Sequence, residues 1–363
     1  MSELTNPPAS GTDLRSRLLS TVSGVTLFIA TCASGPVMAS DGGRPTVWIE
    51  LGGAFAQLEN SEEAYLPSFV AGTSRLSFIT EPPAAIEKPA STSWDGNAKL
   101  RFQPAGSSWM FSIAARYGRN KADRSLDQRT AERTPTNYYF VEHNAYQNLS
   151  AKTVDSHLIL DFSVGKDVGL GMFGQGGKSV INAGIRYAQL ETHTNVGIQY
   201  QPTNVNPLYY PFHRFYGSFD ANRRFIGLGP SLSWDASASL FGNSSDGEIS
   251  FDWGVNGALL IGRQQTQGHH RTTNVRLTYA SALNKHTVYQ SSASPNRSKE
   301  VVVPNLGGFA SVSWRYPNAK VSFGYRADMF FGAIDGGIDA AKKEKRGFYG
   351  PFVSMSIGVG NSP

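Results

Sequence analysis

The chain has 363 residues, of which 40 % are hydrophobic and only 17 % are charged, a low charged fraction for a soluble globular domain. The 33 Lys and Arg against 28 Asp and Glu give a net charge of +5, too small and too dispersed for a nucleic-acid-binding protein. The single cysteine, Cys32, excludes a disulfide framework and a cysteine-based metal site in the rest of the chain. Abundant glycine, many aromatic residues and no long apolar run after residue 40 are typical of a membrane β-barrel.

Residues 1–39 have the organisation of an export signal. Two arginines precede a moderately apolar stretch at residues 18–33, and Val-Met-Ala at residues 37–39 supplies the small side chains that a signal peptidase requires. We therefore expect cleavage directly after this tripeptide, so that residues 40–363 form the mature protein. A buried helix of the mature fold and a lipid-attached Cys32 are the alternatives.

Along the mature chain, apolar and polar residues alternate with a period of two. At residues 153–164, for example, Leu158 and Leu160 alternate with His157 and Asp161. This alternation predicts β-strands with one apolar and one polar face, and about 9–11 residues suffice for a tilted strand to cross a membrane. Ten segments follow the pattern: 46–58, 95–103, 108–118, 153–164, 179–191, 221–235, 248–262, 302–315, 320–332 and 349–359.

The connections between these segments alternate in length. The long ones are residues 59–94, 119–152, 192–220, 263–301 and 333–348, and the short ones are residues 104–107, 165–178, 236–247 and 316–319. Such alternation indicates an all-β, antiparallel, up-and-down transmembrane barrel with long extracellular loops and short periplasmic turns. We expect an even number of strands, about ten with eight to twelve possible, and both termini in the periplasm. Residues 138–141 and 275–279 are candidates for short strands within the long loops.

Three tryptophans support a membrane location. Trp109, Trp234 and Trp314 fall on the outward-facing parity at the predicted periplasmic strand ends, where an aromatic girdle belongs. Trp48 lies out of phase with the apolar residues around it. The alternative is that these tryptophans fill the core of a soluble protein.

Several short motifs resemble the Legionella-type major outer-membrane protein family. They are Ala-Gly-Ile-Arg-Tyr at residues 183–187, Phe-Ile-Gly-Leu-Gly-Pro at 225–230, Ala-Asp-Met-Phe-Phe at 327–331 followed by Asp-Gly-Gly at 335–337, and Phe-Tyr-Gly-Pro-Phe at 348–352. The resemblance covers nearly all of residues 44–359. It implies an outer-membrane β-barrel that forms a pore in a cell with a Gram-negative envelope.

The polar parity of the strands predicts which charged residues line the lumen, because charges that face lipid are costly. They are Lys99, Arg101, Arg116, Asp155, His157, Asp161, Arg186, Asp252, Arg326 and Asp328. These side chains either pair across a narrow, filled lumen or line a water path that they bias by charge. We expect a porin-like passive channel for small solutes with a weak anion bias. The competing class is a non-conducting structural or adhesive barrel with ligand-binding outer loops.

An enzyme ranks third among the functional classes. Asp155 and His157 share one strand face, as an acid–base pair of an omptin-like outer-membrane protease would, but the chain contains no Asp-x-Asp to supply the opposing aspartates. We therefore expect no catalytic activity, no cofactor and no metal site. The expected partners are outer-membrane lipid, lipopolysaccharide bound by basic residues in the long loops, and small solutes, but not nucleic acid.

Overall fold

The computed structural model describes residues 46–60, 92–135, 140–168, 178–201, 212–243, 247–280 and 283–359. All of them belong to one compact unit, Pro45–Pro363. The expected export signal and Cys32 lie outside the described residues. Among the residues described, no helix is long and apolar enough to cross a bilayer.

The described residues form strands joined by turns. The strands are β1 Thr46–Asn60, β2 Thr92–Gln103, β3 Trp109–Pro135, β4 Phe140–Asp167, β5 Lys178–Gln201, β6 Phe212–Asn243, β7 Gly247–Ala280, β8 Leu283–Ala293, β9 Asn296–Arg315, β10 Ala319–Asp335 and β11 Lys343–Val359. The ten predicted segments are confirmed. Each lies within one of the strands β1–β7 or β9–β11, except that the segment 108–118 begins one residue before β3. β8 is the additional strand.

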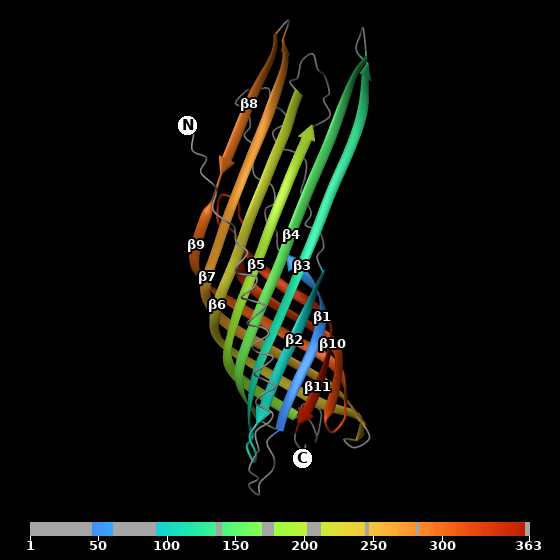
Figure 1. The fold of residues 1–363 in the computed structure, drawn as a ribbon, viewed down its shortest axis with the longest axis vertical. Helices are drawn as coiled ribbons and strands as arrows, with labels where there is room; N and C mark the ends of the chain where they lie inside the picture. The colour runs from blue at the N-terminus through green and yellow to red at the C-terminus, as the bar shows by residue number, and fades with distance from the viewer. Residues whose placement is uncertain are drawn as a thin grey trace, which may run out of the picture. The chain divides into compact units, whose positions relative to one another are not determined.

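Ten of these strands close into an antiparallel barrel. Each strand pairs with its neighbours in chain order, and the barrel closes where β1 pairs with β11 from Val47 opposite Val359 to Asn60 opposite Arg346. β8 and β9 follow one another along β7, and Pro295, which has no backbone N–H to donate, interrupts them. The start of β1 and the end of β11 therefore lie at the same end of the barrel as the short turns (Figure 1).

The predicted long loops 119–152, 192–220 and 263–301 are largely strand, which corrects the expectation for these segments. β3 runs on from Arg119 to Pro135, about 50 Å at ~3.3 Å per residue, and β4 to β8 continue beside it. We call this extension, residues 120–135, 140–155, 192–201, 212–223, 266–280 and 283–293, the outer sheet; it rises beyond the other strands in Figure 1. Periodicity missed it because its outward positions are polar and its inward face mixes apolar residues such as Val196 with polar ones such as Thr194.

The outward face of the barrel carries a belt of exposed apolar side chains. One hydrogen-bonded row across six strands contains only apolar or aromatic residues: Ala115, Leu160, Tyr187, Leu228, Ile261 and Val302. Four residues farther toward the outer sheet, the equivalent row contains only polar residues: Arg119, Ser156, Glu191, Arg224, Gln265 and Ser298. Such a belt on a closed barrel, which leaves no backbone group unpaired, is a lipid-facing surface.

Candidate functional site: the lumen of the barrel

All ten charged residues predicted to line the lumen lie on the inward face of their strands. Six of them border a cavity of about 150 Å³ inside the barrel: Lys99, Arg116, Asp161, Arg186, Arg326 and Asp328. Glu50 and Asp235 complete its charged lining, and we call this space the charged chamber. The side chains of Lys99, Asp161 and Asp235 each keep about a quarter of their surface exposed, and the space is large enough for several water molecules.

Two arginines are tightly paired around the chamber. Arg116 Nη1 donates to Asp328 Oδ2 at 2.5 Å, joining β3 to β10 across the lumen. Arg186 on β5 donates through Nε and Nη2 to the two carboxylate oxygens of Asp161, at 2.7 and 3.1 Å. Its Nη1 also donates to the side-chain oxygens of Asn256 on β7 and Asn305 on β9. These contacts fix opposite walls of the barrel to one another.

Two other cations in the chamber are less constrained. Lys99 Nζ lies 3.9 Å from Asp235 Oδ2, which is a long ion-pair distance. Arg326 has its guanidinium 4.9 Å from the centroid of the Phe352 ring, and no described carboxylate lies within ion-pair distance of it. Positive charge that is only partly compensated therefore faces the water-accessible space.

Asp155 and His157 share the inward face of β4 but have different partners. His157 Nε2 lies 3.1 Å from Oδ2 of Asp95 on β2, and its ring is 4.0 Å from that of Phe348. Asp155 accepts a hydrogen bond from Thr192 and forms an ion pair with Arg346 at 3.3 Å. Asp155 and His157 are only 4 % and 3 % exposed, so neither is placed to meet a peptide substrate.

A second polar cluster occupies the part of the lumen near the short turns. Asp252 on β7 pairs with Lys320 at 2.6 Å and Arg315 at 3.5 Å, and it accepts a hydrogen bond from Ser313. Ser313 in turn bonds to Ser322. The sequence placed Asp252 inward, but it did not identify Lys320 and Arg315 as partners.

An apolar layer crosses the lumen between the charged chamber and the outer sheet. Its buried members come from seven strands or their ends: Ile159, Ala188, Leu190, Phe225, Leu260, Val303, Phe330, Ala333, Ile334 and Phe348. Phe225, Leu260, Val303 and Phe330 are completely buried. A ten-stranded barrel is narrow enough for side chains to fill it at this level.

The connection between β10 and β11 folds into the barrel rather than outward as a loop, which corrects the expectation for residues 333–348. The pairing of β10 with β11 shifts register between Phe330 and Ile334, and Gly332 there has a φ of 70°, a conformation that favours glycine. This irregularity turns Ala333 and Ile334 inward. Ile338 then packs against inner residues of the outer sheet: Leu149, Ala151, Val196, Ile198, Phe219 and Ala221.

Polar contacts hold this plug loop, residues 336–342, in place. Arg297 on β9 donates to Asp335 Oδ2 at 2.8 Å and to the carbonyl oxygens of Gly337 and Ile338 at 3.0 and 2.6 Å. His270 Nε2 lies 2.7 Å from Asp339 Oδ1. Burial alone would raise the pKa of Asp335, but hydrogen bonds from Arg297 and from the backbone N–H groups of Lys342 and Gly337 hold that pKa below its ordinary value.

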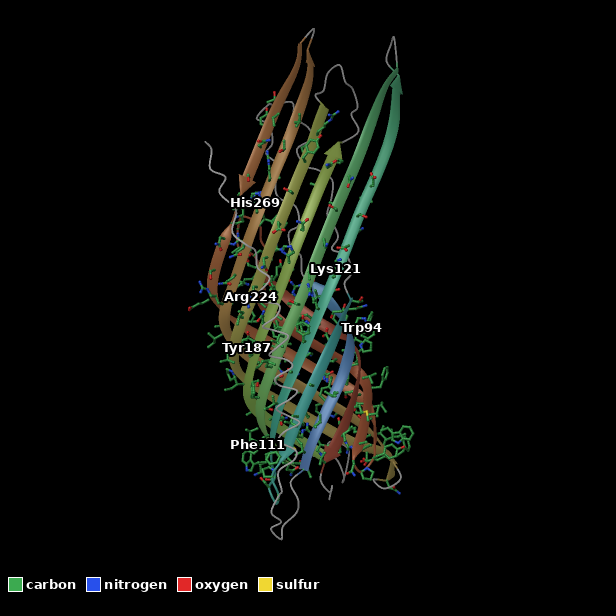
Figure 2. The ribbon with its side chains drawn as sticks, in the orientation of Figure 1. Trp94, Phe111, Lys121, Tyr187, Arg224 and His269 are labelled. Atoms are coloured by element: carbon green, nitrogen blue, oxygen red, sulfur yellow. The ribbon has the colours of Figure 1, made fainter. Side chains whose placement is uncertain are left out.

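The three predicted girdle tryptophans lie on the outward face near the end of the barrel with the short turns. Trp109 and Trp314 are about half exposed, whereas Trp234 is partly covered by Trp253, with ring centroids 4.9 Å apart. At the opposite edge of the belt, Trp94 is 76 % exposed (Figure 2). The sequence analysis did not predict Trp94 as a belt residue, because Trp94 precedes the segment 95–103 that was assigned to the strand.

Several residues at the site escaped the sequence analysis. Asp95 and Asp235 end predicted strands on the inward parity, so strand parity alone could have identified them. Arg297, Asp335 and Arg346 were assigned to loops, and no pattern in those segments indicates that they enter the lumen. The pairing of His157 with Asp95 across an intervening strand also has no counterpart in sequence spacing.

No protein-family model and no curated protein matches this chain. Among solved structures it is similar to the transport unit of the autotransporter AIDA-I from Escherichia coli, at 7 % identity and a TM-score of 0.24, over 88 % of this chain and 93 % of that one. The monoaromatic hydrocarbon channel TodX (deltaS2 mutant) matches at 8 % identity and a TM-score of 0.19, over 90 % and 91 %. The Ralstonia pickettii toluene transporter TbuX matches at 9 % and 0.15, over 87 % and 90 %.

Scores this low carry no argument about activity. The membrane assignment comes instead from the closed sheet, the exposed apolar belt and the charged interior. A closed barrel with this distribution of side chains is a transmembrane β-barrel of the outer-membrane type.

Proposed function

We propose that the protein is a narrow, porin-like passage for small solutes across the outer membrane, and that the plug loop keeps it closed. The observation that carries this proposal is the charged chamber, a water-accessible space inside the barrel lined by partly compensated cations. Buried charge of this kind is costly unless it is paired or solvated, and a passage for polar solutes needs such a lining. The resemblance to pore-forming barrels of the Legionella-type family points the same way.

The closed state is explained by the apolar layer, which excludes water between the chamber and the cell exterior. Ala333 and Ile334 enter this layer only because the chain turns inward after Phe330, and the plug loop continues that inward path. Withdrawal of the plug loop would remove these side chains and Ile338 from the lumen. The side chains that remain belong to the wall strands, so the open passage would admit small solutes only. An apolar constriction of this type gates by excluding water.

The proposed passage is expected to favour anions weakly. Arg326 and Lys99 face the chamber with little or no direct pairing, whereas Asp161 and Asp328 are bound by arginines. Glu50 and Asp235 also line the chamber, so its four cations are matched by four carboxylates, and we expect the preference for anions to be small.

A non-conducting barrel that binds ligands with its extracellular part is the second candidate. The observation that favours it is the outer sheet, which extends far beyond what a membrane crossing requires. The continuous packing of the lumen is also compatible with a purely structural barrel.

Single-channel recording in planar bilayers separates the two functions. The unmodified protein should be mostly closed, and Arg297→Ala, which removes the contacts to Asp335 and the plug-loop carbonyls, should raise the open probability at least about tenfold. Glu300→Ala, at an exposed position on the outward face of the same strand, is the control and should behave like the unmodified protein. Correctly inserted protein that passes no current in either form would contradict the channel and leave the second candidate.

A further inference from the structure

A hollow of about 380 Å³ lies on the outward face of the outer sheet, which is within the size range of small-ligand sites. Two adjacent hydrogen-bonded rows across β4–β7 form it. One row contains Asn148, Gln199, Tyr216 and Thr273, and the other contains Ser150, Gly197, Ser218 and Arg271. We call this the outer hollow. Its depth is due to Gly197, where a side chain is missing between the two serines on either side.

We propose that the outer hollow binds a saccharide, and that the ligand is the sugar chain of the glycolipid in the surrounding outer leaflet. This inference does not depend on whether the lumen conducts, because the hollow lies on the outside of the sheet.

The chemistry of the lining favours a sugar. The amides of Asn148 and Gln199 can each donate and accept hydrogen bonds, as can the hydroxyls of Ser150, Ser218 and Thr273. Sugar hydroxyls need both functions at neighbouring positions. Tyr216 adds a flat aromatic ring with a polar hydroxyl. Such a ring can pack against the C–H face of a sugar while the tyrosine hydroxyl forms a hydrogen bond with a hydroxyl at the edge of the sugar ring.

The charge of the lining has one sign. Arg271 is exposed, no described carboxylate lies within ion-pair distance of it, and no acidic residue lines the outer hollow. A guanidinium in this position suits a sugar that carries a phosphate or carboxylate group, because it can bind such a group through two parallel hydrogen bonds.

Other ligand classes fit the hollow less well. A hydrocarbon would require an apolar lining, whereas Ile198 is the only aliphatic side chain among the described lining residues. A peptide that adds as a strand would require a free sheet edge. The segments of β4–β7 that line the hollow are instead paired on both sides.

The location indicates the source of the sugar. The hollow lies on the same outward face as the apolar belt, and Gly197 is ten residues beyond Tyr187 on β5, about 33 Å at ~3.3 Å per residue. A glycolipid whose acyl chains contact the belt beside Tyr187, labelled in Figure 2, would extend its sugar chain along this face. The ligand would therefore be anchored beside the barrel, at high effective concentration.

Calorimetry with the folded, detergent-purified full chain tests the proposal. The probes are intact lipopolysaccharide from the source cell, the lipid-free polysaccharide released from it by mild acid, and lipid A alone. We expect intact lipopolysaccharide and the lipid-free polysaccharide to bind, and lipid A not to compete with the polysaccharide. Competition of lipid A with the polysaccharide, or no binding of the polysaccharide, would overturn the proposal.

Gly197→Leu places a side chain in the outer hollow, and a Cβ there would meet only Ser150 Oγ, at 3.1 Å, so the strand can accommodate it. We expect at least a tenfold loss of polysaccharide affinity, and a similar loss for Arg271→Gln. Gln267→Leu, an exposed outward position on β7 outside the hollow, is the matched control and should bind normally. Slower migration after boiling verifies that each variant was folded. Unchanged affinity in both hollow variants would refute the assignment.

Discussion

Asp95 on β2 and His157 on β4 meet across the strand between them, with Oδ2 of the aspartate 3.1 Å from Nε2 of the histidine. In the sheet register, Gly118 on β3 lies opposite both residues. A Cβ at this glycine would overlap the carboxylate of Asp95 and the ring of His157. The absence of a side chain at one position thus allows two buried polar groups to join three strands.

Gly118→Ala should therefore destabilise the barrel by about 3 kcal/mol, since it separates a buried polar pair without providing another partner. The measurement is the urea midpoint of unfolding in detergent, followed by migration on unboiled gels. Gly96→Ala is the control, because a Cβ at this neighbouring outward position meets nothing within 4 Å. Equal midpoints for the two variants would contradict the proposed role of Gly118.

The buried pair of Arg116 and Asp328 should behave as a coupled unit. Asp328→Asn leaves the guanidinium of Arg116 in the lumen without its carboxylate, and we expect a loss of about 3–5 kcal/mol in the free energy of unfolding. Arg116→Gln alone should be similarly costly, whereas the double variant should lose much less than the sum of the two. A double-mutant cycle in urea measures this coupling, and additive losses would show that the pair does not act together.

The plug loop should be released in acid. Asp335 has a lowered pKa when the loop is bound, so its contribution is complete above the ordinary value near 4 and is lost as the pH falls below that value. A spin label at exposed Ala340, introduced as Ala340→Cys, should be immobile at pH 7 and mobile at pH 3.

The same label in an Asp335→Asn background supplies the control. This variant removes the titrating carboxylate that faces Arg297, so the label should be mobile at both pH values. A label in the original background that remains immobile down to pH 3 would contradict the role of Asp335.

The position of the lipid belt predicts a depth-dependent cost of charge. Ile185 is half exposed on the belt, so Ile185→Arg should cost about 2–4 kcal/mol and reduce insertion into bilayers. His193→Arg, eight residues farther along the same face of β5, lies beyond the belt and should cost about 1 kcal/mol or less. Folding yield into liposomes measures both, and comparable yields would place the membrane elsewhere.

The membrane-facing part of the barrel was predictable from the sequence, whereas the outer sheet was not. Alternation identified β4 at Leu158 and Leu160 because lipid on one side and a polar lumen on the other impose opposite preferences on successive residues. Beyond Arg119 the outward side meets water, so polar residues occupy positions that were apolar in the belt, and the inward side mixes apolar with polar residues, which weakens the contrast between the two faces. The same strands continue into the outer sheet, but the hydrophobic periodicity of the sequence does not indicate this continuation.

The lumen was predictable residue by residue but not pair by pair. Strand parity placed Arg116, Asp155 and His157 inside the barrel, and the structure has them there. Which groups meet depends on the diameter of the barrel and on contacts between strands distant in sequence, such as β3 with β10. The inward turn of residues 333–338 depends on the register shift after Phe330, which no local motif specifies.

The seam between the first and last strands has a consequence for biogenesis. Val47 is hydrogen-bonded opposite Val359, so the sheet cannot close until β11 has been delivered to the membrane. A chain that lacked β11 would leave the edges of β1 and β10 open in hydrocarbon, where each unsatisfied backbone group costs several kcal/mol. Insertion therefore requires that the chain has been synthesised through β11. Products truncated before β11 would be left outside the bilayer for proteases to remove.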